Sequence, residues 1–296
     1  MFQITGYFIL FLGAAMSGIA LNAVSQTEFD IMVKAEYQSE GMLLNSCVQR
    51  RNDVVGSSYQ FRKVGQVIAQ PHVYGQYGNT QDPGYVPETA ILVPYSVKVE
   101  HDIMQDQLVD FDINSTNARI VGYALGRRSD QIIINAWNST TTTPLPANGT
   151  NFTYDKCRAI VQWFNRKAIP LRERFMVING SALAELMNDI HFTNKLYTLN
   201  DFLDIGKAQA FIGFGLIVIP DMVEGGLPYD QGTNIATCFA VHSMAAGFAV
   251  GVNFQTRTTY ENLITSWLTT ALFSGGSVVV DALGVLHVLC DQTLSP

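Results

Sequence analysis

One stretch constrains the fold of this chain more than any other, because residues 102–137 contain the pattern of a single long helix. Apolar residues recur at spacings of three, four or seven, which places them on one helical stripe: Ala118, Val121, Leu125, Ile132 and Ala136. Asp112 is placed to cap the first turn, and Asp110 adds negative charge at the same end. A helix over 113–137 would be roughly 36 Å long, enough to form the spine of a domain.

The composition requires a sizeable buried core and excludes a disordered chain. Hydrophobic residues make up 48% of the 296 residues and charged residues only 15%. The low charge, with 12 Tyr and 17 Phe, favours contacts with other protein chains, although a large enzyme core would also absorb these residues. The net charge of −7 argues against direct reading of nucleic acid, because gripping phosphates requires clustered Lys and Arg.

An apolar run at residues 7–21 has two interpretations. It is similar to the hydrophobic part of a secretory signal, but Lys34 is the first basic residue and the run is short for a membrane span. We therefore expect an apolar N-terminal arm that packs on its own or a neighbouring subunit. The alternative is a secreted glycoprotein or hydrolase, in which five sequons would matter: Asn114, Asn138, Asn148, Asn151 and Asn179.

A long β-hairpin is predicted before the helix. Residues 91–99 alternate apolar and polar side chains, the period of a strand with one apolar face, and a strand near 61–73 is expected to pair with them. Residues 75–87 between them are rich in turn-forming Gly and Pro and have little to bury. An isolated two-stranded hairpin is marginally stable in water, so this one needs another surface to lie on.

Helices and strands alternate after the spine helix, which predicts an α+β fold. Thr153 is expected to begin a helix that Pro170 stops, and Ser181 to cap another that reaches Ile190; strands are expected at 175–178 and 216–219. The first of these helices has an apolar face of Tyr154, Cys157, Ile160, Val161 and Phe164.

The pattern does not decide the secondary structure of the last part of the chain. Residues 260–273 fit either a helical stripe or a strand. Residues 277–280 and 285–289 flank a turn at 281–284, which predicts a terminal hairpin.

No pattern of reactive side chains predicts an enzyme. The histidines are scattered singly, without H-E-x-x-H: His72, His101, His191, His242 and His287. The cysteines form no C-x-x-C pair, which predicts buried free thiols and no zinc site: Cys47, Cys157, Cys238 and Cys290. There is no G-x-S-x-G or P-loop motif, and Gly213-Phe214-Gly215 precedes a strand rather than a phosphate-binding helix. We therefore predict no catalytic residue, no metal site and no cofactor.

The order of these elements resembles that of the major capsid proteins of tailed bacteriophages, the Hong Kong 97-like fold. The segments that carry the resemblance are 106–112, 175–186, 213–221 and 274–281, and it covers most of the chain after about Lys34. It favours a strand at 264–271. It implies an N-terminal arm (1–45), an E-loop hairpin region (46–98), a P domain with the spine helix (99–150), an A domain (151–253) and P-domain return strands (254–296).

The resemblance also implies a function. Such a chain would be a structural major capsid protein, not an enzyme, that assembles as hexamers and pentamers into an icosahedral head enclosing double-stranded DNA without sequence-specific binding. It would be located in the virion after assembly in the host cytoplasm, with no membrane partner; scaffold, portal and decoration proteins are further partners that it allows. An encapsulin-like compartment shell is a neighbouring interpretation. Some members of the family cross-link Lys to Asn between subunits; Lys63 lies in the hairpin, but no partner Asn or catalytic acid matches here.

Overall fold

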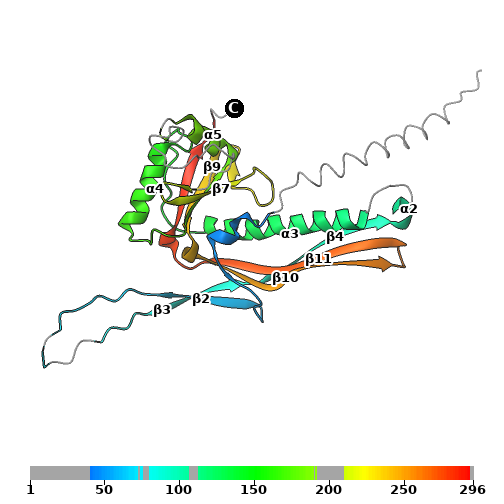
Figure 1. Cartoon of the computed structure of the whole chain (residues 1–296), viewed down its shortest axis with the longest axis horizontal. Coiled ribbons are helices and arrows are strands. Elements are labelled where there is room, and N and C mark those ends of the chain that lie inside the picture. Colours follow the sequence, from blue (N-terminus) through cyan, green and yellow to red (C-terminus); the bar gives the residue numbers. More distant parts are fainter. Residues whose placement is uncertain are drawn as a thin grey trace, which may run out of the picture.

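The computed structural model describes residues 41–293, apart from 73, 76–79, 107–112, 190 and 192–209. The expected arm up to residue 40, the Asp110 and Asp112 cap and Ile190 therefore lie outside the described residues. The described chain forms two sheets joined by one long helix, and a hairpin projects from them (Figure 1).

An elongated four-stranded sheet forms one layer. Its strands, in spatial order, are β1 (Gln49–Arg51), β10 (Ala246–Glu261), β11 (Ser266–Val279) and β4 (Val93–Asp102). β10 and β11 are antiparallel and connected by a short turn, and β4 runs antiparallel to β11 with Val97 opposite Ala271. The short helix α2 (Ile103–Asp106) follows β4 at the far end of the sheet (Figure 1).

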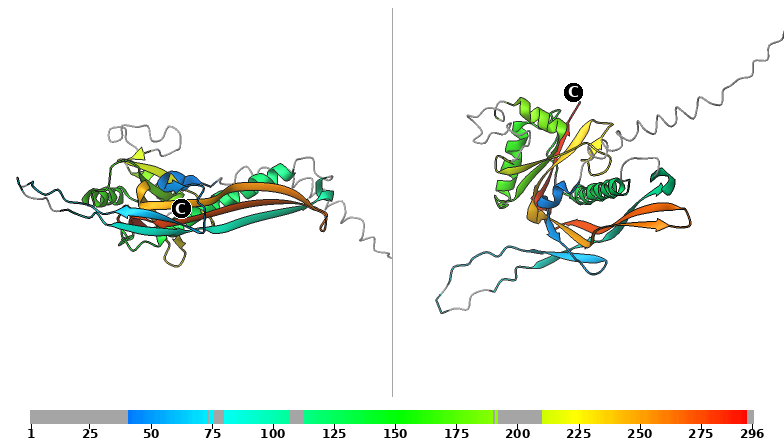
Figure 2. Two further views of the ribbon diagram at one scale, coloured as in Figure 1. Left: turned by 90° about the horizontal axis from the view of Figure 1, so that it is seen from below. Right: turned by 45° about the vertical axis from the view of Figure 1, so that its right-hand side comes forward.

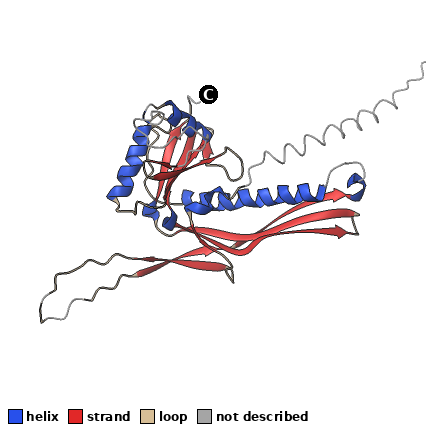
Figure 3. Ribbon diagram, in the orientation of Figure 1, coloured by secondary structure: helices blue, strands red, loops and turns tan. Residues whose placement is uncertain are grey.

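The long helix α3 (Ile113–Asn138) lies along one face of this sheet, as Figure 3 shows. Its predicted extent is confirmed, but its predicted apolar stripe is only partly right. Val121 and Leu125 are buried, whereas Ala118, Ile132 and Ala136 are only half-buried. The buried stripe continues instead through Ser129, Asp130, Ile133, Ile134 and Trp137. The two polar residues in it concealed its direction in the sequence.

The second sheet forms a more compact body at one end of α3. Its strand order is β12 (Val285–Asp291), β9 (Ile235–His242), β5 (Arg174–Asn179), β7 (Phe214–Ile219) and β6 (Ala210–Phe211), with β8 (Tyr229–Asp230) also paired to β9. β5 and β7 are parallel, and β9 is antiparallel to both β5 and β12. This mixture of helices and sheets confirms the α+β expectation.

Two helices pack beside the second sheet. α4 (Tyr154–Arg166) begins after Thr153 as predicted and buries Cys157, Ile160 and Phe164. α5 (Gly180–Asn188) is capped by Asn179 rather than by Ser181, because the Asn179 side chain accepts a hydrogen bond from the Ala182 N–H at 3.0 Å. The cap prediction was therefore wrong by two residues.

A projecting hairpin was predicted before α3, and one is present, but its second strand was assigned to the wrong residues. β2 (Ser58–Val64) pairs antiparallel with β3 (Tyr85–Ile91), and this pair projects from the body (Figure 2). The alternating segment predicted as its second strand, residues 91–99, belongs mainly to β4 and pairs with β11. Its half-buried residues Tyr95, Val97 and Val99 explain the alternation, because they pack against the core under α3.

The predicted terminal hairpin was also wrong. Residues 277–279 end β11 in the four-stranded sheet, whereas β12 pairs with β9 in the other sheet. The backbone N–H groups of Val280 and Asp281 donate to the Ala245 carbonyl at 2.8 and 3.0 Å, which turns the chain between the sheets. The buried Lys156 amine then holds β12 by donating to the Leu289 carbonyl at 2.8 Å. Residues 260–273, ambiguous in the sequence, end β10 at Glu261 and continue after a short turn in β11 from Ser266, so the strand expectation for 264–271 is largely confirmed.

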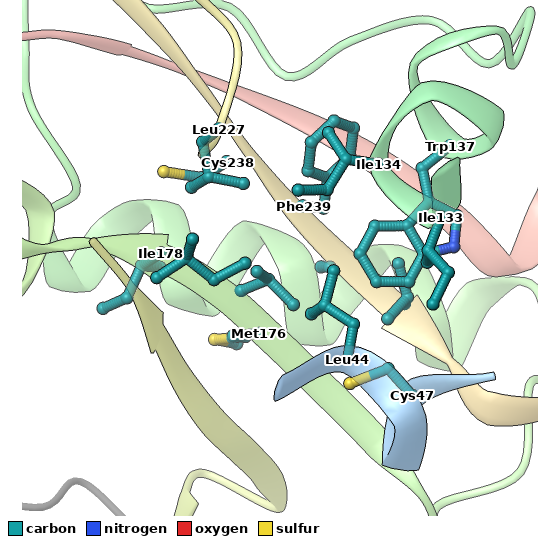
Figure 4. Close-up of a cluster of buried hydrophobic side chains, with 14 of the residues drawn as sticks. Leu44, Cys47, Ile133, Ile134, Trp137, Met176, Ile178, Leu227, Cys238 and Phe239 are labelled. Carbon is teal, nitrogen blue, oxygen red and sulfur yellow. The ribbon is translucent and has the colours of Figure 1, made fainter. Parts of the chain in front are cut away.

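One continuous apolar core joins the two sheets through α3. Figure 4 shows Leu44 and Cys47 of the short helix η1 (Leu43–Cys47) beside Ile133 and Trp137 of α3, with Met176 and Phe239 of the second sheet in the same cluster. Because the core is shared, α3 and the body cannot be separated without exposing it. Among the described helices, none is both long and apolar enough to cross a membrane.

Candidate functional site

The β2–β3 hairpin is anchored at its base by one aromatic ring. Phe61 is buried in a small cluster with Ala90, Leu92 and Ala249, separate from the main core. Its ring lies over Gly247 of β10, where a Cβ atom would come within 2.6 Å of the ring. Glycine at this position therefore permits the close approach of the hairpin to the sheet.

Two residues after Phe61 in β2, Lys63 forms an ion pair with Asp281. Lys63 Nζ lies 2.7 Å from Asp281 Oδ1, and Asp281 also accepts a hydrogen bond from the Leu283 N–H at 3.2 Å. Both charged side chains are more than a third exposed, so the pair contributes at most about 1 kcal/mol to stability. Its geometry helps to set the direction of the hairpin. Lys63, considered in the sequence for a cross-link, is thus paired within its own chain.

Beyond this base the hairpin exposes large apolar side chains to solvent. They are Val64, Val67, Ile68, Tyr74, Tyr85 and Val86, and Tyr74 is 97% exposed. The loop strands are bridged by one side chain: Gln81 accepts from the Ile68 N–H and donates to the Ile68 carbonyl, both at 2.9 Å. Such an arm has too little contact of its own to bury these groups, and exposed apolar surface of this kind is typical of an interaction site.

Charge is distributed unevenly between the hairpin base and the far end of the long sheet. Arg50, Arg51 and Arg62 are exposed near the base. At the opposite end of the sheet, Glu100 and Asp102 are exposed on β4 and Glu261 is half-buried at the end of β10. The sequence has no Lys or Arg between residues 99 and 118 or after Arg257. Exposed arginines therefore gather near the hairpin base and carboxylates gather at the far end of the sheet, where Lys98 and Arg257 are also exposed.

A second candidate site is the junction at which residues 41–47 meet α3. The Asp130 carboxylate accepts hydrogen bonds from the backbone N–H groups of Leu43 and Leu44 at 3.1 and 3.2 Å. Gly41 has a φ of +71° and abuts Gly126 of α3, and a Cβ atom there would lie 2.1 Å from the Gly126 carbonyl carbon. Burial raises the pKa of Asp130 to about 6, although these hydrogen bonds oppose the shift. The junction is thus fixed by a buried acid with a pKa of about 6.

The histidines and cysteines remain dispersed in structural positions. His287 Nε2–H donates to the Trp137 carbonyl at 2.8 Å at the end of α3, and His242 accepts from the Met244 N–H. All four cysteines are buried and free, as predicted, and burial raises the pKa of Cys47 to about 12. Within the described part of the chain, no three His, Cys, Asp or Glu side chains gather where they could hold a metal ion.

Of the sequon residues, Asn179 lies inside the protein as the cap of α5. Its side-chain amide already has hydrogen-bond partners, since it accepts from the Ala182 N–H and donates to Asp221 Oδ1 at 3.3 Å. Sequence reasoning did not find Asp130, Phe61 or Asp281 as functional residues. No local pattern in the sequence marks any of the three, and Asp130 interrupts the apolar residues of the buried stripe of α3.

The comparisons with known proteins agree with this architecture. A family model described as phage capsid protein matches residues 21–292 of the sequence. The chain belongs to the phage capsid protein family. No protein of curated function matches this capsid protein closely enough to count as a relative.

Solved phage capsids share its fold. The capsid of Ralstonia phage GP4 is 12% identical over 88% of this chain and 93% of that chain, with a TM-score of 0.67. The capsid of cyanophage P-SCSP1u is 14% identical over 83% and 87%, with a TM-score of 0.64, and Mycobacterium phage Che8 is 15% identical over 79% and 85%, with a TM-score of 0.60. The capsid protein therefore has the Hong Kong 97-like fold. Its family makes it a structural protein of the virion that assembles with itself into a capsid shell.

Proposed function

We propose that this capsid protein assembles as hexamers and pentamers that close into an icosahedral head around double-stranded DNA. The exposed hairpin is the observation that carries the proposal. Among the residues that the structure describes, this long two-stranded arm with exposed apolar side chains meets no stabilising surface beyond its base. Heterologous contacts with a neighbouring copy supply such a surface and, when repeated around a symmetry axis, close into rings.

Carboxylates at the far end of the sheet would support contacts between copies. The basic residues at the hairpin base, Arg50, Arg51 and Arg62, would meet an acidic region such as that at Glu100 and Asp102 on another copy. The net charge of −7 suits a shell that encloses DNA without binding its sequence.

We propose a domain division that follows the two sheets. The β2–β3 hairpin is the E-loop, the four-stranded sheet with α3 is the P domain, and the six-stranded sheet with α4 and α5 is the A domain. Because β12 pairs with β9, residues 285–291 fall in the A domain rather than among P-domain return strands. Residues 1–45 remain the N-terminal arm in this proposal.

The remaining parts of the proposal concern activity and partners. We propose that the protein has no catalytic activity, cofactor or metal of its own, and that it assembles in the host cytoplasm. Scaffold, portal and decoration proteins would be its further partners. A Lys–Asn cross-link is not proposed, since Lys63 already pairs with Asp281.

Electron microscopy of the purified protein tests the central proposal. We expect closed shells with five-fold and six-fold capsomers, and nuclease-protected DNA in particles recovered from infected cells. Particles that hold an enzyme cargo and no DNA would favour a compartment shell instead. A protein that forms only soluble monomers under all assembly conditions would contradict the proposal.

A further inference from the structure

The distal half of β10 is an open edge of the four-stranded sheet. The short strand β1 pairs with β10 only at residues 247–249. Beyond a bulge, residues 255–261 pair with β11 in an unbroken antiparallel register, and no described strand pairs with their other side. Figure 1 shows β10 along the border of the sheet, and residues 255–260 are all exposed. This length of strand therefore lacks a partner among the described residues.

An open strand edge is a template for another strand. In a strand that is paired on one side only, every second residue directs its N–H and C=O groups outward. Sheets that must stay single place Pro and charged residues on such an edge. The opposite edge, β4, has four of them in its 10 residues: Pro94, Lys98, Glu100 and Asp102. Residues 252–261 of β10 contain no Pro and only two charges, so β10 is the less protected edge.

The side chains of this edge are typical of a strand inside a sheet. Thr256, Thr258 and Tyr260 belong to the types that favour strands. They lie on the α3 side of the sheet, because Thr258 is opposite Thr269, which is in turn opposite the core residue Val99. The alternating residues, which include both charges, therefore lie on the face away from α3.

The two charges on that outer face have no partner within the described chain. Arg257 and Glu261 make no ion pair there, and their neighbours on β11 are the uncharged Thr270 and Ser266. They cannot reach each other, because residues four apart on a strand are separated by about 14 Å. The edge thus carries an unpaired cation and an unpaired anion at a fixed spacing.

This spacing is complementary to itself. When two β10 edges meet antiparallel about a two-fold axis at Thr259, Arg257 of each copy lies directly opposite Glu261 of the other. Residues directly opposite across an antiparallel pair have Cβ atoms about 5 Å apart, within reach of an ion pair. On the other face, Thr258 lies opposite Tyr260, an aromatic and β-branched pair of the kind that stabilises sheets. One register therefore satisfies both faces.

The helices leave room for this pairing. α3 lies over β11 and packs on one face of the sheet. Joining two β10 edges places the two β11 strands three strand spacings apart, roughly 14 Å. A helix with its side chains is about 10–12 Å wide, so the two α3 helices do not collide.

We propose that residues 255–261 of β10 pair antiparallel with the same residues of a second copy, which joins two four-stranded sheets across a two-fold axis at Thr259. The contact is isologous, because both copies use the same patch. The proposal rests on the assembly function proposed above. It adds to the heterologous contacts that close rings a two-fold contact that links a subunit of one ring to a subunit of the next.

Charge reversal tests the register. Arg257→Glu sets carboxylates opposite each other at two points of the contact, and Glu261→Arg sets cations there. We expect each single variant to lower shell assembly about tenfold or more, because like charges placed directly opposite repel. The double variant R257E/E261R restores both ion pairs with reversed direction, and we expect it to assemble within about threefold of the wild type.

Lys98→Glu is the matched control, since it reverses a charge on the exposed outer face of the opposite edge. We expect it to assemble as the wild type does. Single variants of β10 that assemble normally, or a double variant that is no better than the single ones, would overturn the proposal. Loss of assembly in Lys98→Glu alone would overturn it as well, because the contact would then use β4.

Cross-linking at the axis gives an independent measurement. Thr259→Cys shells are treated with a bifunctional methanethiosulfonate reagent that spans about 5 Å, the expected separation of opposite Cβ atoms. We expect covalent dimers on a non-reducing gel, joined through the introduced thiols. The four native cysteines are buried, so they do not compete for the reagent.

Gln255→Cys is the control for register. Residue 255 lies on the same face of the same strand, but in the proposed register it is roughly 27 Å from its counterpart in the second copy. We expect no dimer from it. Absence of dimers from Thr259→Cys, or equal dimer yields from the two positions, would contradict the two-fold axis at Thr259.

Failure of this inference is distinguishable from failure of the assembly function. If the unmodified chain forms no shells, the assembly function is wrong and the edge pairing falls with it. If the unmodified chain forms shells, but the β10 variants assemble normally and Thr259→Cys gives no dimer, only the edge pairing is wrong.

Discussion

Burial and hydrogen bonding shift the pKa of Asp130 in opposite directions, and burial has the larger effect. Burial raises its pKa from 3.8 to about 6, so the native state binds a proton more readily than the unfolded chain. Its contribution to stability is therefore fully present below about pH 4 and is lost as the pH rises through about 6. The pKa difference corresponds to roughly 3 kcal/mol.

We predict that Asp130→Asn removes this pH dependence. The free energy of unfolding of the unassembled subunit should be measured by denaturant titration between pH 4 and pH 8 for both proteins. As the pH falls from 8 to 4, the wild type should gain up to about 3 kcal/mol relative to the variant, because the other titrating groups are common to both. A constant difference across this range would show that Asp130 does not titrate as its burial implies.

The single side chain of Phe61 holds the β2–β3 hairpin against the four-stranded sheet. Replacing Phe61 by Ala empties the space over Gly247, and we expect the hairpin to open locally with a cost of about 3 kcal/mol. Hydrogen exchange should accelerate in β2 and β3, while the two-sheet body melts as before. Phe61→Leu, which keeps most of the apolar contact, is the control. Unchanged exchange in the Ala variant would show that the ring is not the anchor.

At the scale of elements, the hairpin and the body have separate roles. Replacing Gln76 to Val86 with a short Gly-Ser turn leaves the Phe61 cluster in place and removes only the end of β3, where Tyr85 and Val86 pair with Val64 and Lys63. Ordering the loop costs roughly 1 to 2 kcal/mol per residue, which its own few contacts do not offset. We therefore expect a soluble subunit that melts cooperatively but no longer closes into shells, as judged by calorimetry and electron microscopy. Normal shells, or a subunit that cannot fold, would contradict an intersubunit role for the loop.

At the scale of the whole molecule, residues 43 and 44 are held against α3 by the Asp130 carboxylate. The apolar run at 7–21 has no basic residue before it, unlike a secretory signal. We predict that the run is retained in assembled particles, and intact-mass measurement of the particle protein checks this. A mass lower by about the first 25 residues would favour the secreted alternative instead.

Local patterns in the sequence were enough to predict part of the elements. The helices α3 and α4, the strands β5 and β7, a projecting hairpin and the buried thiols follow from periodicity, turn residues and spacing, because these depend on near neighbours in the chain. The strands β9 and β10, which are central to the two sheets, were not predicted. The order of the elements was enough to place the chain in its family.

Only the tertiary structure decided which elements pair. Residues 91–99 and 285–289 have strand patterns that fit a neighbour in sequence, yet they pair with β11 and β9. The choice depends on distant contacts, such as the Lys156 amine that holds β12 and the aromatic ring of Phe61 on Gly247. The stripe of α3 was misread for the same reason: Asp130 is buried because residues 43 and 44, some 86 positions away, supply its hydrogen bonds. A helical period can show that a face exists, but the partner that covers it determines which polar residues that face can bury.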